Sequence, residues 1–157
     1  MRPEYLKISP LLILSFFLGF LMAGGKISSQ EKIQPVFLNP PERSQAPFSE
    51  AVRFGQWLIL SGQLGRDPAT GKLVEGGIEA ETKQTLENIK RTLEKYGSSL
   101  DKVVKCTVML ADMTEWEKMN KVYITYFPKN RPARSTFGVS GLVGGARVEI
   151  ECWAIIE

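Results

Sequence analysis

Residues 131–157 read RPARSTFGVSGLVGGARVEIECWAIIE, and this stretch decides the fold. Two runs of β-forming residues, 133–139 and 147–156, flank a glycine-rich segment, which predicts two strands joined by a loop. Arg134 lies at the start of the first strand, and Glu149 lies inside the second. Charged side chains in an otherwise apolar segment call for a reason, so these two are the first candidates for a functional site.

Alternation along 147–156 predicts a strand with two different faces. The residues of one face, which we expect in a core, are Val148, Ile150, Cys152, Ala154 and Ile156. The residues of the other face are Glu149, Glu151, Trp153 and Ile155. If that second face is buried between subunits, the pKa of Glu149 would rise and its carboxyl group could transfer protons near neutral pH. If the face meets solvent, both glutamates are simply exposed or ion-paired.

The side chain of Arg134 has a geometry suited to binding. A guanidinium group offers a planar fork of donors, which binds a carboxylate through two hydrogen bonds. The alternative is structural, either a surface arginine or an ion pair with Glu149 or Glu151. The residues alone leave both interpretations open.

The rest of the domain predicts two helices among further strands. The first is a hairpin, with Val52 and Phe54 on one strand and Trp57 to Leu60 on the other. A loop over 65–73, a helix over 79–97 and a strand over 103–110 follow. The second helix begins at a capping box over 114–117 and ends at Pro128. The order β-β-α-β-α-β-β predicts an α+β fold, with a mixed sheet and both helices on one face.

The opposite face of that sheet is predicted to be apolar. It would carry Val103, Met109, Trp153 and Ile155. Such a face is unfavourable in water, so we expect a second copy of the chain to cover it.

Composition excludes several kinds of chemistry. The chain has 157 residues, enough for one domain, and no histidine, which excludes His-based triads and His-liganded metals. A net charge of +3 is too mild to indicate a nucleic-acid partner. Its two cysteines, Cys106 and Cys152, cannot form a cysteine-rich zinc site. Both lie on apolar strand faces and are expected in the core; if the protein is exported they could pair, but their spacing does not decide it.

The first 25 residues have the order of a secretory signal. Arg2 and Lys7 precede an apolar stretch over 8–23, and small residues follow at 23–25. This predicts export to the periplasm or the cell exterior. One alternative is an uncut membrane anchor, although the stretch is short of the roughly 20 residues of a spanning helix. Another is a cytosolic protein with a mis-called start codon.

Three segments follow from these patterns. Residues 1–25 are the signal peptide or anchor, the proline-rich residues 26–47 form a linker and extended lead-in, and residues 48–157 form the domain.

Four segments of the domain resemble the Rid (YjgF) family. They are SGQLGRDPATGKLVEGGIEAETKQTLENIKRTLE (61–94), KCTVMLADM (105–113), MNKVYITYF (119–127) and above all RPARSTFGVSGLVGGARVEIE (131–151). The likeness runs from about Asn39 to Glu157. It implies a chorismate-mutase-like (YjgF-type) subunit in a homotrimer, with the sheets forming an inner barrel and a cleft between each pair of neighbouring subunits.

The resemblance also implies an activity. RidA-type members hydrolyse reactive enamines and imines, derived from amino acids, to 2-keto acids and ammonia, without a metal or cofactor. The implied partners are therefore small imine and enamine carboxylates. Arg134 matches the residue that holds the substrate carboxylate, and Glu149 matches the acid that positions the attacking water. Ser61 and Asn120 match other residues that line the pocket.

This sequence departs from the family pattern at three positions. Phe48 stands where the family often has Tyr, Thr136 where it often has Cys, and Val143 where it often has Pro. The first two changes affect the substrate-binding pocket and bear on substrate range and rate, while the pair of Arg134 and Glu149 is intact.

Two functions compete at this point. The first is enamine/imine deamination. The second is a non-catalytic trimeric module that binds small carboxylates or a protein, which the predicted export favours because imine-producing enzymes normally work in the cytosol. Nucleic-acid cleavage is disfavoured by the mild charge and by the lack of a basic stripe. Association with a membrane is expected only if the N-terminal segment stays uncut.

Overall fold

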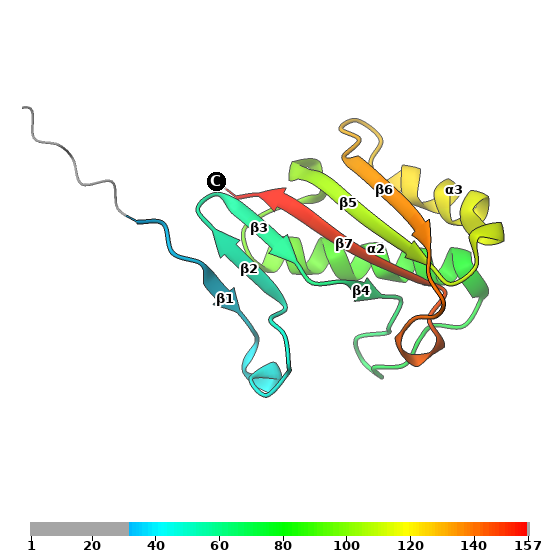
Figure 1. Ribbon diagram of the computed structural model, residues 1–157, viewed down its shortest axis with the longest axis horizontal. Helices are drawn as coiled ribbons and strands as arrows, with labels where there is room; N and C mark the ends of the chain where they lie inside the picture. The colour runs from blue at the N-terminus through cyan, green and yellow to red at the C-terminus, as the bar shows by residue number, and fades with distance from the viewer. Residues whose placement is uncertain (1–31, 157) are drawn as a thin grey trace, which may run out of the picture. The chain divides into compact units, whose positions relative to one another are not determined.

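The computed structural model describes residues 32–156, which contain seven strands and two α-helices (Figure 1). The strands are β1 (Val36–Leu38), β2 (Ala51–Phe54), β3 (Trp57–Leu60), β4 (Gln63–Leu64), β5 (Val103–Leu110), β6 (Ala133–Gly138) and β7 (Val148–Ile155). The helices are α2 (Gly77–Lys95) and α3 (Trp116–Tyr126), with short 3-10 turns at Pro41–Arg43, Leu100–Lys102, Met113–Glu115 and Val143–Gly145.

The strands form one mixed sheet in the order β1-β2-β3-β7-β5-β6, and β4 pairs with β7 beside β3. All neighbours are antiparallel except β5 and β6. Parallel neighbours need a crossover, and α3 supplies it. The expected α+β fold is therefore confirmed, with β1 and the two-residue β4 added to the predicted order.

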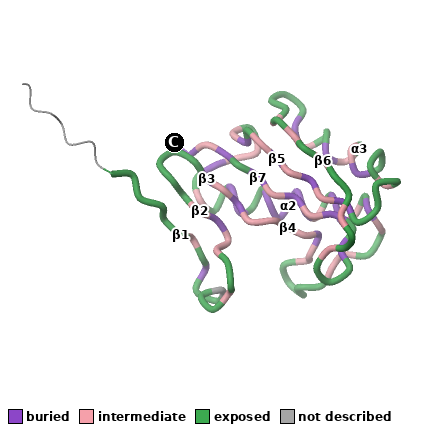
Figure 2. Tube along the Cα trace, viewed as in Figure 1, coloured by how far each residue is buried: buried purple, intermediate pink, exposed green. Residues whose placement is uncertain are grey.

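Both helices pack on one face of the sheet and close a single core (Figure 1). The apolar stripe of α2, Leu86, Ile89 and Leu93, is fully buried there. Figure 2 shows buried positions alternating with more exposed ones along β7. This alternation is the predicted one, because the apolar face of the last strand meets the helices and the face of Glu149 points away.

The other face of the sheet is not covered by any helix of the described part. Trp57 and Trp153 meet there edge to face, with ring centroids 6.4 Å apart, and remain 43% and 42% exposed. The prediction was wrong for Val103, which is buried in the helix-side core. A bulge between Val103 and Lys105 adds one residue to β5, so the alternation changes face at that point.

The ends of the two helices differ in how well they were predicted. Gly97 follows α2 with a φ of 82°, and Ser98 donates its backbone N–H to Leu93 O at 2.8 Å, as expected for a glycine-ended helix. The predicted capping box at 114–117 is wrong. Asp112 accepts from both the backbone N–H and the hydroxyl of Thr114, so this threonine caps nothing itself.

The predicted linker is partly structured. Its residues 36–38 form β1, which pairs with β2 at the edge of the sheet. Asn39 then accepts a hydrogen bond from the backbone N–H of Glu50 at 2.8 Å. The predicted signal or anchor over 1–25 lies outside the described residues. Among residues 32–156, no helix has both the length and the apolar character needed to cross a bilayer.

Candidate active site

Arg134 is held against α3 by one hydrogen bond and two aromatic rings. Its Nη2 donates to Oδ1 of Asn120 at 2.9 Å. The guanidinium carbon lies 4.4 Å from the ring centroid of Tyr123 and 5.9 Å from that of Trp116. Aromatic faces stabilise a cation without using its hydrogen-bond donors, so most donors of Arg134 stay available.

Strand register explains why Arg134 faces this helix. In the parallel pair of β5 and β6, Arg134 is the partner of Cys106, whose side chain is buried in the core. Residues paired across neighbouring strands project to the same face, so Arg134 points toward α3. Asn120 and Tyr123 follow Trp116 at helical spacing, which brings all three to the same side of α3.

The structural alternative for Arg134 is not found in residues 32–156. No ion pair there joins it to Glu149 or Glu151. Instead it lines a pocket of about 310 Å³ together with Trp116 and Asn120. A half-buried guanidinium with unused donors at a pocket can bind an anion, and a carboxylate fits its fork.

Two hydroxyl groups near Arg134 are buried and make no hydrogen bond to a nitrogen or oxygen atom of the described residues, and that of Tyr123 lies beside the thiol of Cys106. They belong to Tyr123 and to Thr136, which lies two residues further along β6 on the same face. Burial raises the pKa of Tyr123, so this phenol stays protonated. Unsatisfied buried hydroxyls are unusual, and a buried water could supply the missing hydrogen bonds.

Glu149 occupies a second pocket, of about 400 Å³, on the opposite face of the sheet. Phe48, Arg66 and Val143 also line it. The carboxylate lies directly against Gly62, because a Cβ built on this glycine would be 1.9 Å from Oε1 of Glu149. Burial, and then the charge of Glu151, raise the pKa of Glu149. A carboxyl group with a raised pKa suits proton transfer to and from water.

Ser61 precedes Gly62, and its hydroxyl group is engaged. It donates to the backbone oxygen of Ser49 at 2.7 Å, and its backbone N–H donates to Glu50 O at 3.1 Å. These bonds tie the end of β3 to the segment that carries Phe48, which is 53% exposed. Ser61 therefore shapes the pocket of Glu149 through the backbone, and its hydroxyl oxygen can still accept a hydrogen bond.

The loop that carries Val143 is fixed by Arg147. The backbone N–H of Arg147 donates to Glu81 at 2.9 Å, and its Nη1 lies 2.6 Å from Oε1 of Glu115. Glu81 is buried on α2. The C-terminal end of the glycine-rich loop is thus tied to α2 and to the turn before α3, and Val143 lines the pocket of Glu149.

The predicted site residues divide into two half-sites within one chain. We call the pocket with Arg134, Asn120, Tyr123 and Trp116 the Arg134 half-site, and the pocket with Glu149, Gly62, Phe48 and Arg66 the Glu149 half-site. Thr136 follows Arg134 on the helix side, and Ser61 borders the Glu149 half-site. Since Arg134 and Glu149 point to opposite faces of the sheet, one chain does not bring them together.

Sequence reasoning missed three residues of these half-sites. Trp116 and Tyr123 fall within the helix predicted before Pro128 but are not among the predicted site residues, although their spacing from Asn120 places them on its face. Arg66 was treated as part of a loop. It lines the pocket of Glu149, and its Nη1 donates to Gly71 O at 2.8 Å. Its closeness to Ser61 in sequence was the available signal.

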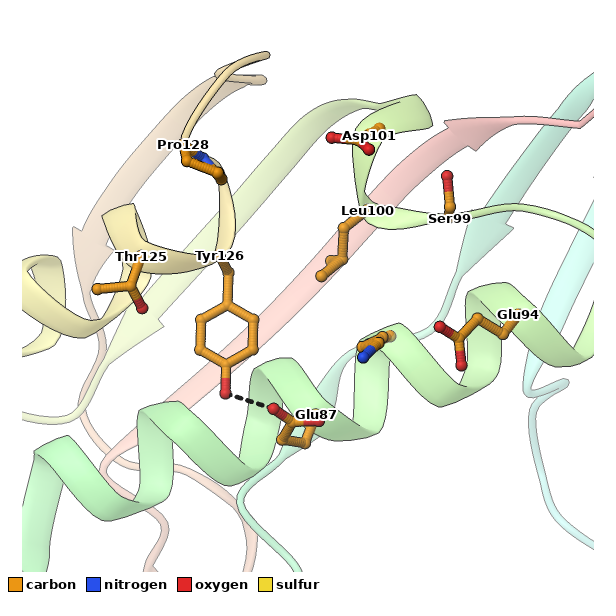
Figure 3. A pocket seen from close by; sticks show the side chains of 9 residues that line it. Glu87, Glu94, Ser99, Leu100, Asp101, Thr125, Tyr126 and Pro128 are labelled. Atoms are coloured by element: carbon orange, nitrogen blue, oxygen red, sulfur yellow. Dashed lines mark hydrogen bonds between the residues drawn. The ribbon is translucent and has the colours of Figure 1, made fainter.

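A third hollow lies between α2, the end of α3 and the turn at residue 100 (Figure 3). Tyr126 donates to Glu87 there at 2.7 Å, and burial raises the pKa of this tyrosine. None of the predicted site residues lines this hollow. No cluster of three or more potential metal ligands occurs in residues 32–156.

Known proteins resemble the chain over nearly all of its described part. A family model described as endoribonuclease L-PSP matches residues 39–156. A RutC family protein of Pyrococcus horikoshii is 43% identical over 78% of this chain and 97% of its own length. A mouse 2-iminobutanoate/2-iminopropanoate deaminase is 44% identical over 69% of this chain and 81% of its own. The crystal structure of RidA from an Antarctic Psychrobacter species has a TM-score of 0.68 and 36% identity, covering 81% of this chain and all of that one.

Proposed function

The chain belongs to the endoribonuclease L-PSP family, also called Rid or YjgF, and on this premise we propose that it is a deaminase of reactive imines and enamines. The products are a 2-keto acid and ammonia. The relatives named 2-iminobutanoate/2-iminopropanoate deaminase support small imino acids as the substrate type.

The observation that carries this proposal is the state of Arg134. It is half-buried, oriented by Asn120 and Tyr123, and has no carboxylate partner in the described part of the chain. A substrate carboxylate would complete its hydrogen bonds. The imine carbon next to that carboxylate would then be held at a fixed distance from the guanidinium group.

Glu149 supplies the proton transfer in this proposal. An imine carbon is electrophilic once its nitrogen is protonated, so hydrolysis needs an oriented water and one group that accepts a proton from it. Glu149 takes that proton while the water oxygen bonds to the carbon. Glu149 then passes this proton to the nitrogen of the carbinolamine and takes the proton of its hydroxyl group. The carbon–oxygen double bond forms as the carbon–nitrogen bond breaks, so that ammonia leaves and the 2-keto acid remains.

A second copy of the chain would bring the two groups together. Arg134 and Glu149 lie on opposite faces of one sheet, and the face of Glu149 carries the exposed Trp57 and Trp153. We therefore propose a homotrimer in which the Arg134 half-site of one subunit meets the Glu149 half-site of its neighbour. Burying the two tryptophans would also supply part of the association energy.

The test is an assay in which an amino-acid oxidase generates imines of several amino acids. The full chain should accelerate release of the 2-keto acid, and Arg134→Ala should not. Lys121→Ala is the matched control, because it removes an exposed cation next to Asn120 on α3. If wild type and Arg134→Ala accelerate release equally, the carboxylate-binding role of Arg134 is wrong.

A carboxylate-binding module without turnover is the second candidate. Phe48 brings no hydroxyl to the pocket of Glu149, and Thr136 carries a hydroxyl where the family often has a thiol. Calorimetric binding of 2-keto acids to an oligomer that hydrolyses no imine would favour this candidate. Export likewise remains a proposal, which N-terminal sequencing of the protein from separated cell fractions tests.

A further inference from the structure

Cys106 and Cys152 face each other across the centre of the sheet. They are register partners in the antiparallel pair of β5 and β7, and their Sγ atoms lie 3.0 Å apart. Both side chains are fully buried. The proposed hydrolysis uses neither thiol, so the pair needs a separate explanation.

The backbone geometry allows a covalent bond between them. Directly opposed residues of antiparallel strands have Cα atoms about 4.5 to 5.5 Å apart. Disulfides join Cα atoms about 4.4 to 6.8 Å apart, so β5 and β7 need no rearrangement. The two thiols also differ. The hydrogen bond between them lowers the pKa of Cys106 and raises that of Cys152, which favours Cys106 as the attacking thiolate.

We propose that Cys106 and Cys152 form an intramolecular disulfide by thiol–disulfide exchange with a small-molecule disulfide. The Cys106 thiolate attacks the reagent, forms a mixed disulfide and releases one thiolate. Cys152 then loses its proton and attacks Cys106, which releases the second thiolate. In sum, two protein thiols lose two electrons and two protons, and the reagent is reduced to two thiols.

The position of the pair determines what the bond would constrain. The two cysteines are 46 residues apart in sequence, and the loop that the bond would close contains α3 and β6. Cys106 is also the register partner of Arg134. The bond would therefore join β5 to β7 and close a covalent loop that contains the elements of the Arg134 half-site. Because both thiols are buried, we expect closure during folding or local opening rather than in the closed native state.

The compartment decides whether the bond forms. Exported proteins meet oxidising surroundings, whereas glutathione keeps cytosolic thiols reduced. The N-terminal order of basic, apolar and small residues predicts export, which is compatible with closure. The inference does not depend on the proposed deaminase activity, since its readouts are mass and thermal stability.

The test compares two refolding reactions of the full chain. Reduced, denatured protein is refolded with reduced glutathione alone or with a mixture rich in oxidised glutathione, then denatured and alkylated. We expect two alkylated thiols in the first case. In the second we expect none, a mass lower by two hydrogen atoms, and one cross-linked peptide pair after digestion. Two alkylated thiols after oxidative refolding, a glutathione adduct, or a disulfide between chains would overturn the proposal.

Variants separate closure from other effects of the oxidant. Cys106→Ser and Cys152→Ser should each keep one alkylatable or glutathione-bound thiol. The double variant Cys106→Ala/Cys152→Ala should show no change of Tm between the two buffers, whereas the wild type should gain several degrees on oxidation. If refolding is inefficient, the folded protein is incubated with oxidised glutathione in sub-denaturing urea, and the same readouts apply.

Discussion

The two half-sites are built in different ways. Arg134 is positioned by side chains of a helix, through the amide of Asn120 and the ring of Tyr123. Glu149 is positioned by close approach of backbone, because Gly62 leaves the space its carboxylate fills. The first arrangement keeps a cation ready to bind, and the second keeps an acid partly desolvated. Binding and proton transfer therefore rest on separate elements and can be impaired separately.

Removing the cation should have the largest effect. Arg134→Ala is expected to lower kcat/KM for small imino acids by about 1,000-fold, because it removes charge-assisted hydrogen bonds to the substrate. Arg134→Lys should retain part of the activity, since it keeps the charge but not the planar fork. Steady-state kinetics and a melting curve measure this. A fall in Tm that matches the activity loss would point to misfolding rather than lost binding.

Removing the acid should affect turnover more than binding. Glu149→Gln is expected to lower kcat by about 100-fold and leave KM nearly unchanged. The same substitution should lower activity but not the stability of the fold. Because the pKa of Glu149 is raised in the folded state, ionisation destabilises the fold as pH rises through that pKa. Above this window, Glu149→Gln should melt at or above the temperature of the wild type. An altered KM with unchanged kcat would contradict the water-activating role.

Displacing the acid should have a smaller effect than removing it. In Gly62→Ala the added methyl group would overlap Oε1 of Glu149, so the carboxylate has to move. We expect kcat to fall about tenfold, with the binding of 2-keto acids at Arg134 retained. Gly141→Ala serves as a control, because it makes the same substitution at an exposed glycine with open space around the added methyl group. Wild-type kcat in Gly62→Ala would show that the position of Glu149 is not critical.

Mixing two inactive variants tests whether neighbouring chains share a site. Arg134→Ala and Glu149→Gln chains are denatured together and refolded together. If each site takes Arg134 from one chain and Glu149 from another, random mixing restores about one site in four. If both residues came from the same chain, every site would lack one of them and no activity would return. Each variant refolded alone is the control.

The pH profile should show the smallest effect. The acid limb of kcat is expected to have its midpoint above 4.5, the ordinary value for Glu, because burial raises the pKa of Glu149. Glu151→Gln removes the second cause of that shift and should move the midpoint to lower pH. A midpoint that does not move would mean that the charge of Glu151 is not felt at Glu149.

Features that depend on a local residue pattern, such as strand faces and helices, were predicted correctly from the sequence. Period-two alternation placed Glu149 opposite the core, and helical periodicity predicted both helices. Prediction from the sequence failed where a backbone irregularity or a nearby side chain changes the local pattern. Val103 moved to the core because of a bulge in β5, and Thr114 lost its capping role to Asp112.

The candidate site was predicted only as a set of residues. Alternation shows which residues share a face within one strand. It does not show which face of β6 lies on the same side of the sheet as a given face of β7, because that depends on how both strands pair with β5. The separation of Arg134 from Glu149 could therefore not be derived from the sequence. Arg66 and Trp116 were missed for a similar reason, since their place in a pocket depends on elements distant in sequence.

The strand that carries Arg134, β6, is also an edge strand of the sheet. Among residues 32–156, β6 pairs only with β5, so its outer edge offers backbone groups that no described strand pairs with, and Phe137 beside them is 46% exposed. Such an edge invites strand addition by another chain. A chain that stays unassembled would thus be prone to aggregate as well as inactive, and loss of solubility would be an early sign of a damaged interface.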